Sequence, residues 1–383
     1  MRSLTPTAGS DRNPNGHTEA EILAALQGHT GTRRWSFRYE HLDTDGSWIQ
    51  DLDNVLGGSV SQNWLADVKR TASFTLAERG GFDFLADRIR PNVKLHLPPY
   101  GTADWVEWPQ GVFLLTTPTR KAEESGLVLR EVEGYDQLQV YADEQVDDRY
   151  AVAAASNVVD AVVDVLESVL VPPAMNVTPH AGTLVTAKEW PPGTTKLSII
   201  NELLGAVNYE SLSFDEDGVA VVQPYRSPAE RAEEYVYAAD QHGLVFPDAE
   251  QTMDLWKVAN KWILVVSEAD QPAIRSVYTN SDPASPTSTV RRQRTITDYR
   301  EEQEAVTQAV LDAKAARLAF EASQVYETIP FTTGLMPIHS GNDVYRLVIP
   351  ALAINANYSE HTWKLSLAAG VPMEHEARRV VTV

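Results

Sequence analysis

The sequence predicts an α+β protein that is predominantly β, and three observations carry this prediction. Short segments in which apolar and polar residues alternate recur through the first and last thirds of the chain. The middle third shows helical periodicity instead. Finally, 383 residues are long for one hydrophobic core, which favours roughly two to four packed units.

Residues 1–31 are expected to form an N-terminal arm with one short helix. The arm is polar and rich in turn residues until Thr18-Glu-Ala-Glu21, whose spacing is that of a capping box. Ile22, Leu23 and Leu26 then supply the apolar face of the helix. The sequence leaves the role of the arm open.

The first β-domain is expected at residues 32–140. A turn at Asp43-Thr-Asp45-Gly46 follows its first strand, and a short helix-like stretch at residues 81–89 is stopped by Pro91. Strands of this length separated by turns are typical of a β-barrel or a sandwich. The predicted strands cover residues 35–39, 72–76, 93–97, 112–116 and 127–132.

Residues 141–250 are expected to form a small acidic α+β insert. Its first helix is capped by Ser156 or Asn157 and ends at Pro172-Pro173. Residues 151–250 carry 4 basic and 15 acidic groups, so the insert holds much of the negative charge of the chain. The predicted elements are helices at residues 157–170 and 197–207 and strands at residues 211–214 and 219–222.

Residues 251–383 are expected to form a second β-domain with one flanking helix. After a polar loop at residues 280–289, Asp298-Tyr-Arg-Glu301 is expected to cap the longest helix, which runs from Gln303 to Phe320. The predicted strands cover residues 262–266, 276–278, 325–329, 345–349, 351–357 and 361–367.

The composition excludes several classes of protein. The chain has 32 basic and 53 acidic residues, a formal charge of −21, which disfavours sequence-specific nucleic-acid binding and binding to anionic membranes. It has no cysteine, so disulfide scaffolds and thiol nucleophiles are excluded. No apolar run reaches the roughly 18 residues that predict a membrane-spanning helix.

The sequence predicts no catalytic, cofactor-binding or metal-binding residue, no cofactor and no enzymatic activity. It lacks a glycine-rich phosphate loop and a nucleophile elbow, and its nine histidines are scattered singly. His41 with Asp43 and Asp45 resembles part of a metal site, but a polar hairpin turn is the preferred interpretation. The acidic run at residues 215–218 is likewise interpreted as a hairpin and not a calcium loop.

Two other groups of residues have more than one interpretation. Trp105 and Trp108, three residues apart on an expected loop, are assigned to core or rim packing, to a protein interface, or to glycan binding. Basic clusters at Arg33-Arg34, at Lys69-Arg70 and at residues 291–294 are either solvated or form ion pairs between subunits.

The order of elements in the last third resembles the second tube-like barrel of phage baseplate hub proteins. A long helix precedes Glu327-Thr-Ile-Pro330, and Gly334-Leu-Met-Pro337 and a Gly341-Asn-Asp343-Val344 turn follow. Tyr345-Arg-Leu-Val348 and a closing pair around Ala353-Ile-Asn-Ala and Trp363-Lys-Leu-Ser-Leu367 complete the pattern.

The front of the chain is similar to the matching first barrel, and the resemblance spans about residues 32–370. The segments that carry it are Trp35-Ser-Phe-Arg-Tyr39, residues 69–76, Asp87-Arg-Ile-Arg-Pro91, Trp108-Pro-Gln-Gly-Val-Phe-Leu-Leu115 and Val132-Glu-Gly-Tyr-Asp136. The pattern looks like that of minor tail proteins of long-tailed phages, a family similar to the hub base of contractile injection systems.

The resemblance implies two tail-tube-like β-barrel domains with the small α+β domain inserted between them. It also implies a structural function: a homotrimeric ring at the tail tip, through which DNA passes, that joins the tail tube, distal tail protein and tape measure protein to a central fibre or spike. The chain would then reside in the virion, after assembly in the host cytoplasm. A carbohydrate- or receptor-binding β-protein of the tail tip is the alternative.

Overall fold

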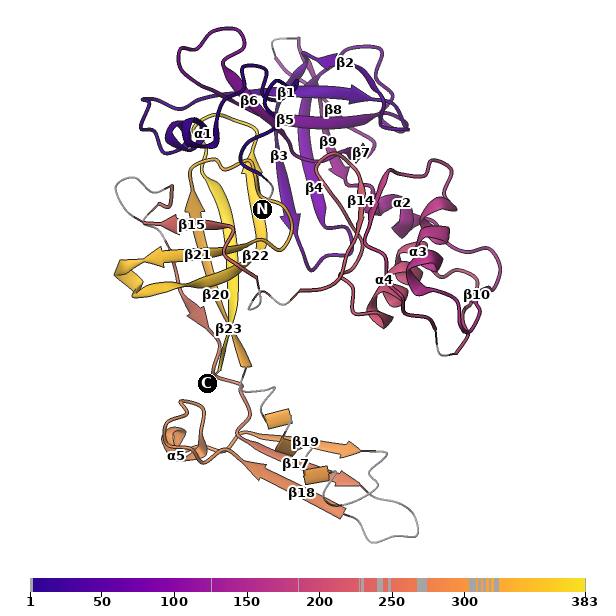
Figure 1. The fold of residues 1–383 in the computed structure, drawn as a ribbon, viewed down its shortest axis with the longest axis vertical. Coiled ribbons are helices and arrows are strands. Elements are labelled where there is room, and N and C mark those ends of the chain that lie inside the picture. The colour runs from indigo at the N-terminus through magenta and orange to yellow at the C-terminus, as the bar shows by residue number, and fades with distance from the viewer. Residues whose placement is uncertain are drawn as a thin grey trace. The chain divides into compact units, whose positions relative to one another are not determined.

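The predominantly β, α+β class is confirmed by the computed structural model (Figure 1). The chain divides into two compact units, Met1–Asp248 with Phe331–Glu376, and Ala249–Pro330 with Ala377–Val383. The four-part division expected from the sequence stays a prediction. The structure describes residues 3–124, 126–184, 186–226, 228, 231–239, 244–246, 249–266, 274–302, 308, 311–312, 315–316, 318–319 and 324–382.

A large, mainly antiparallel sheet dominates the first unit. Its N-terminal strands follow the path β3-β4-β9-β7-β5-β1-β2, with β6 beside β5 and β8 beside β9. They are β1 (Arg34–Leu42), β2 (Trp48–Leu52), β3 (Val55–Asn63), β4 (Arg70–Ala77), β5 (Arg88–His96), β6 (Trp105–Pro109), β7 (Phe113–Leu115), β8 (Thr119–Ala122) and β9 (Val128–Tyr135).

C-terminal strands extend this sheet beyond β3. Strand β22 pairs with β3 in antiparallel register, so that Thr362 lies opposite Asn63 and Leu365 opposite Val60. The path continues through β23 to β20, while β21 pairs with β22 and β15 runs parallel to β21. These strands are β15 (Tyr235–Ala238), β20 (Gln324–Thr333), β21 (Val344–Ile349), β22 (Ile354–Ser366) and β23 (Met373–Thr382); the 3-10 helix η2 (Pro350–Leu352) precedes β22.

Alternation in the sequence explains which strand face is buried. Along β4 the side chains of Arg70, Ala72, Phe74 and Leu76 are buried and the intervening ones are more exposed, as the period of two requires. Phe74 packs edge-on against Phe113, with ring centroids 6.0 Å apart. The core of the sheet therefore lies on the side predicted by the apolar positions.

The N-terminal arm packs on the first unit through the predicted helix. Helix α1 (Glu19–Leu26) begins after Thr18, whose side chain forms the complete capping box with Glu21. It buries Ile22 and Leu26. The backbone amide of Glu107 on β6 donates to the carbonyl of Arg12 at 2.9 Å, so the arm also forms a hydrogen bond with the sheet.

The insert forms a second hydrophobic core within the first unit, to which β14 contributes Ala220 and Val222. Its helices lie together in Figure 1. Asn157 caps α3 by accepting from the amides of Val159 and Asp160, as predicted, and Thr195 caps α4. The elements are α2 (Leu138–Asp143), β10 (Tyr150–Val152), α3 (Val158–Glu167), β11 (Met175–Val177), β12 (Lys188–Trp190), α4 (Lys196–Ala206), β13 (Ser213–Phe214) and β14 (Ala220–Val222).

The second unit contains a three-stranded sheet in the order β18-β17-β19. The expected cap at residues 298–301 is wrong, because this segment is strand β19 and pairs in parallel with β17, placing Tyr299 opposite Ile263. Most of the helix expected from Gln303 to Phe320 lies outside the described residues. The elements are β16 (Thr252–Met253), β17 (Lys261–Val266), β18 (Ile274–Thr279), α5 (Thr289–Arg292) and β19 (Thr297–Glu302).

The helix-like stretch expected at residues 81–89 is also wrong. The amides of Ala86 and Asp87 both bond to the carbonyl of Asp83, which makes a single turn, and Arg88 already begins β5. Pairing of Ile89 with Phe113 on β7 competes with continuation of the turn. Among the described residues, no helix has the length and apolarity to span a membrane.

Candidate functional site

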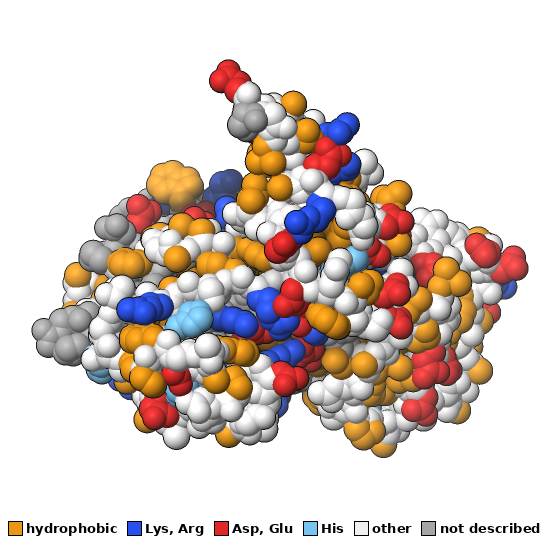
Figure 2. Space-filling view, turned by 90° about the horizontal axis from the view of Figure 1, so that it is seen from above, with side chains coloured by type: hydrophobic (Ala, Val, Ile, Leu, Met, Phe, Trp, Pro, Cys, Tyr) orange, Lys and Arg blue, Asp and Glu red, His pale blue; other side chains and the backbone are white. Residues whose placement is uncertain are grey.

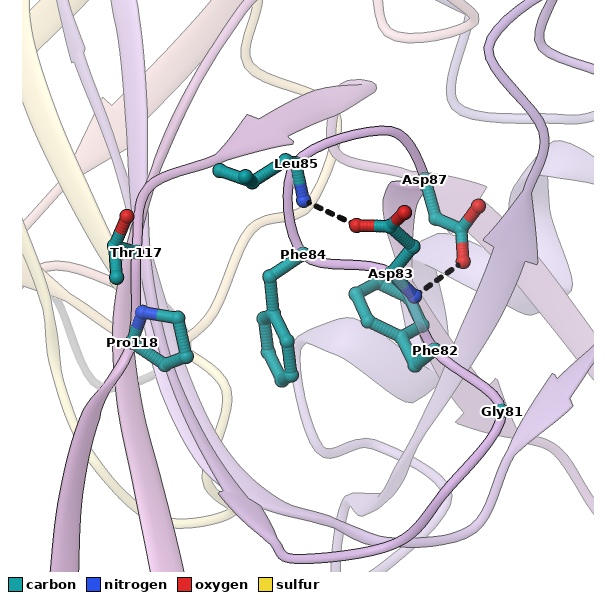
Figure 3. Close-up of a pocket in the computed structure, with 8 residues that line it drawn as sticks. All are labelled: Gly81, Phe82, Asp83, Phe84, Leu85, Asp87, Thr117 and Pro118. Carbon is teal, nitrogen blue, oxygen red and sulfur yellow. Dashed lines mark hydrogen bonds between the residues drawn. The ribbon is translucent and has the colours of Figure 1, made fainter.

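The loop between β4 and β5 projects apolar side chains from the surface of the first unit. Together with Thr117 and Pro118, which follow β7, residues 81–85 and Asp87 line a pocket of about 590 Å³ (Figure 3). Phe84 points toward Pro118 across this pocket (Figure 3). The side chain of Leu85 is 77% exposed.

Two carboxylates hold the loop in this conformation. Asp87 Oδ2 accepts from the amide of Asp83 at 2.8 Å and lies 2.6 Å from His41 Nε2 on β1, and the amide of Leu85 donates to Asp83 Oδ1 at 3.0 Å. The Phe82 ring packs on the His41 imidazole, with centroids 4.7 Å apart, and on Phe84 at 4.9 Å. The apolar side chains are therefore presented by a fixed backbone.

Strand β2, which pairs with β1 on the edge opposite β5, exposes two further apolar side chains. Trp48 and Ile49 are 59% and 44% exposed. Gln50 on β2 lies 3.4 Å from His41 Nδ1, so His41 contacts both β2 and the loop. Trp48, Ile49 and Leu85 are exposed, whereas Phe82 and Phe84 are partly buried. Exposed aromatic and aliphatic side chains on a fixed backbone are suited to contact another protein.

Charge is distributed unevenly over the first unit. On the face seen in Figure 2, acidic side chains gather over the insert at the right with few basic ones among them. A buried ion pair joins the insert to the sheet: Arg70 Nη2 on β4 lies 2.9 Å from Glu216 Oε1. Lys69 Nζ donates to Ser211 Oγ at 2.8 Å.

Two of the basic clusters, at Lys69-Arg70 and at residues 291–294, form hydrogen bonds or ion pairs within the chain; neither of their two interpretations, solvation or ion pairing between subunits, included such bonds. Lys69 and Arg70 are buried and bond within the chain, as described above. In the second unit, Arg292 donates to the carbonyl of Val258 at 2.9 Å and Arg294 to that of Trp256 at 2.7 Å. These clusters stabilise loops of their own chain.

The two preferred hairpin interpretations are confirmed. Residues 43–47 connect β1 and β2, and His41 pairs with Asp87. The run at residues 215–218 connects β13 and β14, with Gly218 at a φ of +81°.

The tryptophans expected on a loop lie on strand β6. Trp108 is buried, while Lys94 Nζ sits 3.9 Å from the ring centroid of Trp105. Core packing is the interpretation that fits Trp108. Because this ring is buried, the two tryptophans cannot stack on a sugar together.

A buried polar cluster lies where β22 and β23 meet the segment before β21. His339, Glu360 and His375 are each no more than 4% exposed, and one ligand-type atom from each falls within 4.8 Å of the others. His375 Nδ1 and His339 Nδ1 lie 3.2 Å and 3.4 Å from Glu360 Oε2, and Asp343 Oδ2 lies 3.0 Å from His339 Nδ1. Sequence reasoning missed this cluster because strand pairing alone brings the three residues together.

The electrostatics of the cluster follow from its burial. Burial lowers the pKa of His375 below its ordinary value, and the charge of Glu360 opposes this shift. Burial and the nearby Glu360 raise the pKa of Tyr237 well above its ordinary value. Tyr237 is therefore a neutral phenol, and its hydroxyl lies 2.5 Å from His339 Nε2.

The fold is shared with tail proteins of known structure. A tail protein from Neisseria meningitidis MC58 matches with a TM-score of 0.59 and 10% identity, covering 90% of this chain and 97% of that one. The 43 kDa tail protein of prophage MuSo2 from Shewanella oneidensis matches with a TM-score of 0.59 and 11% identity, covering 90% and 98%. No family model and no curated protein matches the sequence. The resemblance to phage tail proteins is thus confirmed at the level of the fold.

Proposed function

We propose that this chain is the structural, non-enzymatic hub subunit of a phage tail tip. Three copies form a ring that joins the sixfold tail tube and the distal tail protein to a threefold central fibre or spike, and DNA passes through it. The observation that carries the proposal is a fold shared with tail proteins over 90% of this chain and nearly all of theirs.

In this proposal each subunit supplies two tube-like barrels, so that three subunits present six similar positions to the tube. Strands β1 to β9 belong to one and strands β20 to β23 to the other. Their pairing through β22 and β3 supports such an arrangement, because it fixes the two halves side by side in one sheet. Among the described residues the strand path is open at β2, which leaves that edge available to a neighbouring subunit.

The surface chemistry supports an assembly role. Trp48 and Ile49 lie on the edge strand β2, and Leu85 projects from the fixed loop before β5, so all three expose apolar surface that a partner can bury. The formal charge of −21 suits a ring that conducts DNA, because an acidic wall repels phosphate over about 8 Å at physiological ionic strength. The tape measure protein is a further proposed partner during assembly in the host cytoplasm.

Light scattering on the purified chain tests the proposal. Three chains of 42.3 kDa give about 127 kDa. Leu85→Asp is expected to shift the mass toward one chain by placing a charge in the contact, whereas Leu170→Asp, at a fully exposed leucine of the insert, is expected to leave the trimer intact. A wild-type chain that stays monomeric at every concentration, and forms no ring with the distal tail protein in electron micrographs, contradicts the hub.

A further inference from the structure

The spacing of the polar atoms around Glu360 is that of ligands around a metal ion. His375 Nδ1 and His339 Nδ1 lie 3.2 Å and 3.4 Å from Glu360 Oε2. In a tetrahedral zinc site with bonds of about 2.0–2.1 Å, neighbouring ligand atoms are about 3.3–3.4 Å apart. Both imidazole-to-carboxylate separations thus already match those around a shared cation, and all three ligand-type atoms lie within 4.8 Å of one another.

Hydrogen bonding indicates which nitrogen of His375 carries the proton. The Thr333 hydroxyl donates to the carbonyl of Gly334 at 2.8 Å, so toward His375 Nε2, also at 2.8 Å, its oxygen accepts. His375 Nε2 therefore carries a proton. In a neutral imidazole, Nδ1 then has no proton, and its lone pair faces the Glu360 carboxylate. The nitrogen and the carboxylate oxygen are both acceptors, so a cation between them is stabilising.

Glu360 provides an independent indication of a ligand. Its side chain is 1% exposed, and Oε1 has no hydrogen-bond partner of normal geometry among the described residues. The buried hydroxyl of Tyr345 lies close enough to the Glu360 carboxylate to interact with it, but it cannot supply the positive charge that a buried carboxylate requires. A buried carboxylate oxygen without a partner is costly unless a cation compensates it. Asp343, 3.0 Å from His339, adds a second buried carboxylate.

We propose that His339, Glu360 and His375 bind one divalent transition-metal ion, zinc by preference, in a buried site to which they supply three ligands. Two imidazoles and a carboxylate favour zinc over calcium or magnesium, which take oxygen ligands. The second nitrogen of each imidazole bonds outward, His375 to Thr333 and His339 to Tyr237, as ligating histidines commonly do. The ion would hold together β22, β23 and the segment before β21.

Metal content and thermal unfolding of the full-length chain test the site. After dialysis against a chelator and addition of Zn²⁺, the wild type is expected to retain one zinc ion per chain. Its Tm is expected to rise by about 5 °C at a hundredfold excess of Zn²⁺ over the Kd. Co²⁺ in place of Zn²⁺ is expected to give the visible absorption of a four-coordinate ion.

Variants separate ligation from folding. Glu360→Gln and His375→Gln are expected to lose the zinc ion and the rise in Tm. The control His41→Gln removes an imidazole that is 2% exposed and paired with Asp87, and it is expected to keep both. Wild-type chain that binds no zinc and shows no rise in Tm overturns the proposal, even if a variant fails to fold. Zinc retained by both Glu360→Gln and His375→Gln overturns it as well. Zinc binding and the rise in Tm are measured separately from the mass of the trimer, so the metal site and the hub function can fail independently.

Discussion

The insert and the region around Glu360 have cores of opposite chemistry. The insert packs aliphatic and aromatic side chains from α2, α3 and α4 on one another, with Val162, Ile200 and Leu203 fully buried. Around Glu360, two histidines, two carboxylates and two tyrosine rings are buried together. Apolar burial is non-directional and depends on area, whereas a buried polar group depends on the position of its partner. The two regions should therefore respond differently to substitution.

The largest expected effect is at the ion pair that joins the insert to the sheet. Glu216→Ala removes the carboxylate that pairs with the buried guanidinium of Arg70 and is expected to lower the free energy of unfolding by about 3–5 kcal/mol. Glu189→Ala removes a pair with Arg149 whose side chains are 69% and 45% exposed, and is expected to cost about 0–1 kcal/mol. Denaturant unfolding measures both; equal effects would show that the insert is not held by this pair.

A substitution that creates a cavity in the insert tests how much its apolar core contributes to stability. Leu203→Ala is expected to lower the free energy of unfolding by about 2–5 kcal/mol, because the leucine is fully buried. Leu170→Ala, at a fully exposed leucine, is expected to change it by no more than about 0.5 kcal/mol. Chemical denaturation followed by circular dichroism distinguishes the two, and a small effect of Leu203→Ala would mean that the core can collapse around the cavity.

The junction between sheet and insert should show a specific pH dependence. Burial raises the pKa of Asp136 from 3.8 to about 6, against the charge of Arg70 and the amides of Leu138 and Arg70. The folded chain then binds this proton more tightly than the unfolded chain between those two values. This residue's contribution to stability therefore falls as the pH rises from about 4 to 6, by at most about 1.4 kcal/mol per pH unit, and is constant above.

Asp136→Asn is expected to remove that slope. The difference in free energy of unfolding between wild type and variant, measured by urea titration from pH 4 to pH 7, should change up to about pH 6 and then level off. A difference that is constant across this range would show that Asp136 titrates normally in the folded chain.

The smallest expected effects on stability come from replacing a glycine by alanine, once near Glu360 and once in the insert. A methyl group at Gly341 meets ring carbons of Trp64 well inside van der Waals contact, so Gly341→Ala is expected to destabilise by about 1–3 kcal/mol. Gly205 lies in α4 with nothing within 4 Å of an added Cβ, so Gly205→Ala is expected to stabilise by about 0.5–1 kcal/mol. Thermal melts give the sign of each change, and the same sign for both would contradict the packing described here.

The elements that the sequence predicted well are those governed by neighbouring residues. The capping box at Thr18, the cap at Asn157 and the hairpin at residues 215–218 depend on side chains within a few positions of one another. The failures have the opposite character. Residues 81–89 have helical spacing, but Arg88 and Ile89 already pair in β5 and so stop the turn, and residues 298–301 look like a cap but pair with β17.

The sequence by itself determined the predominantly β class, the helix caps at Thr18 and Asn157 and the acidity of residues 151–250, because these depend on local periodicity, capping and composition. The likeness to tail proteins rested on a resemblance in the order of segments and short motifs. Tertiary structure alone decided that β22 pairs with β3, that Glu216 reaches Arg70, and that Glu360 and His375 meet His339. Contacts between residues far apart in the chain depend on strand pairing and register. Local patterns of apolar and polar residues do not specify which strands pair.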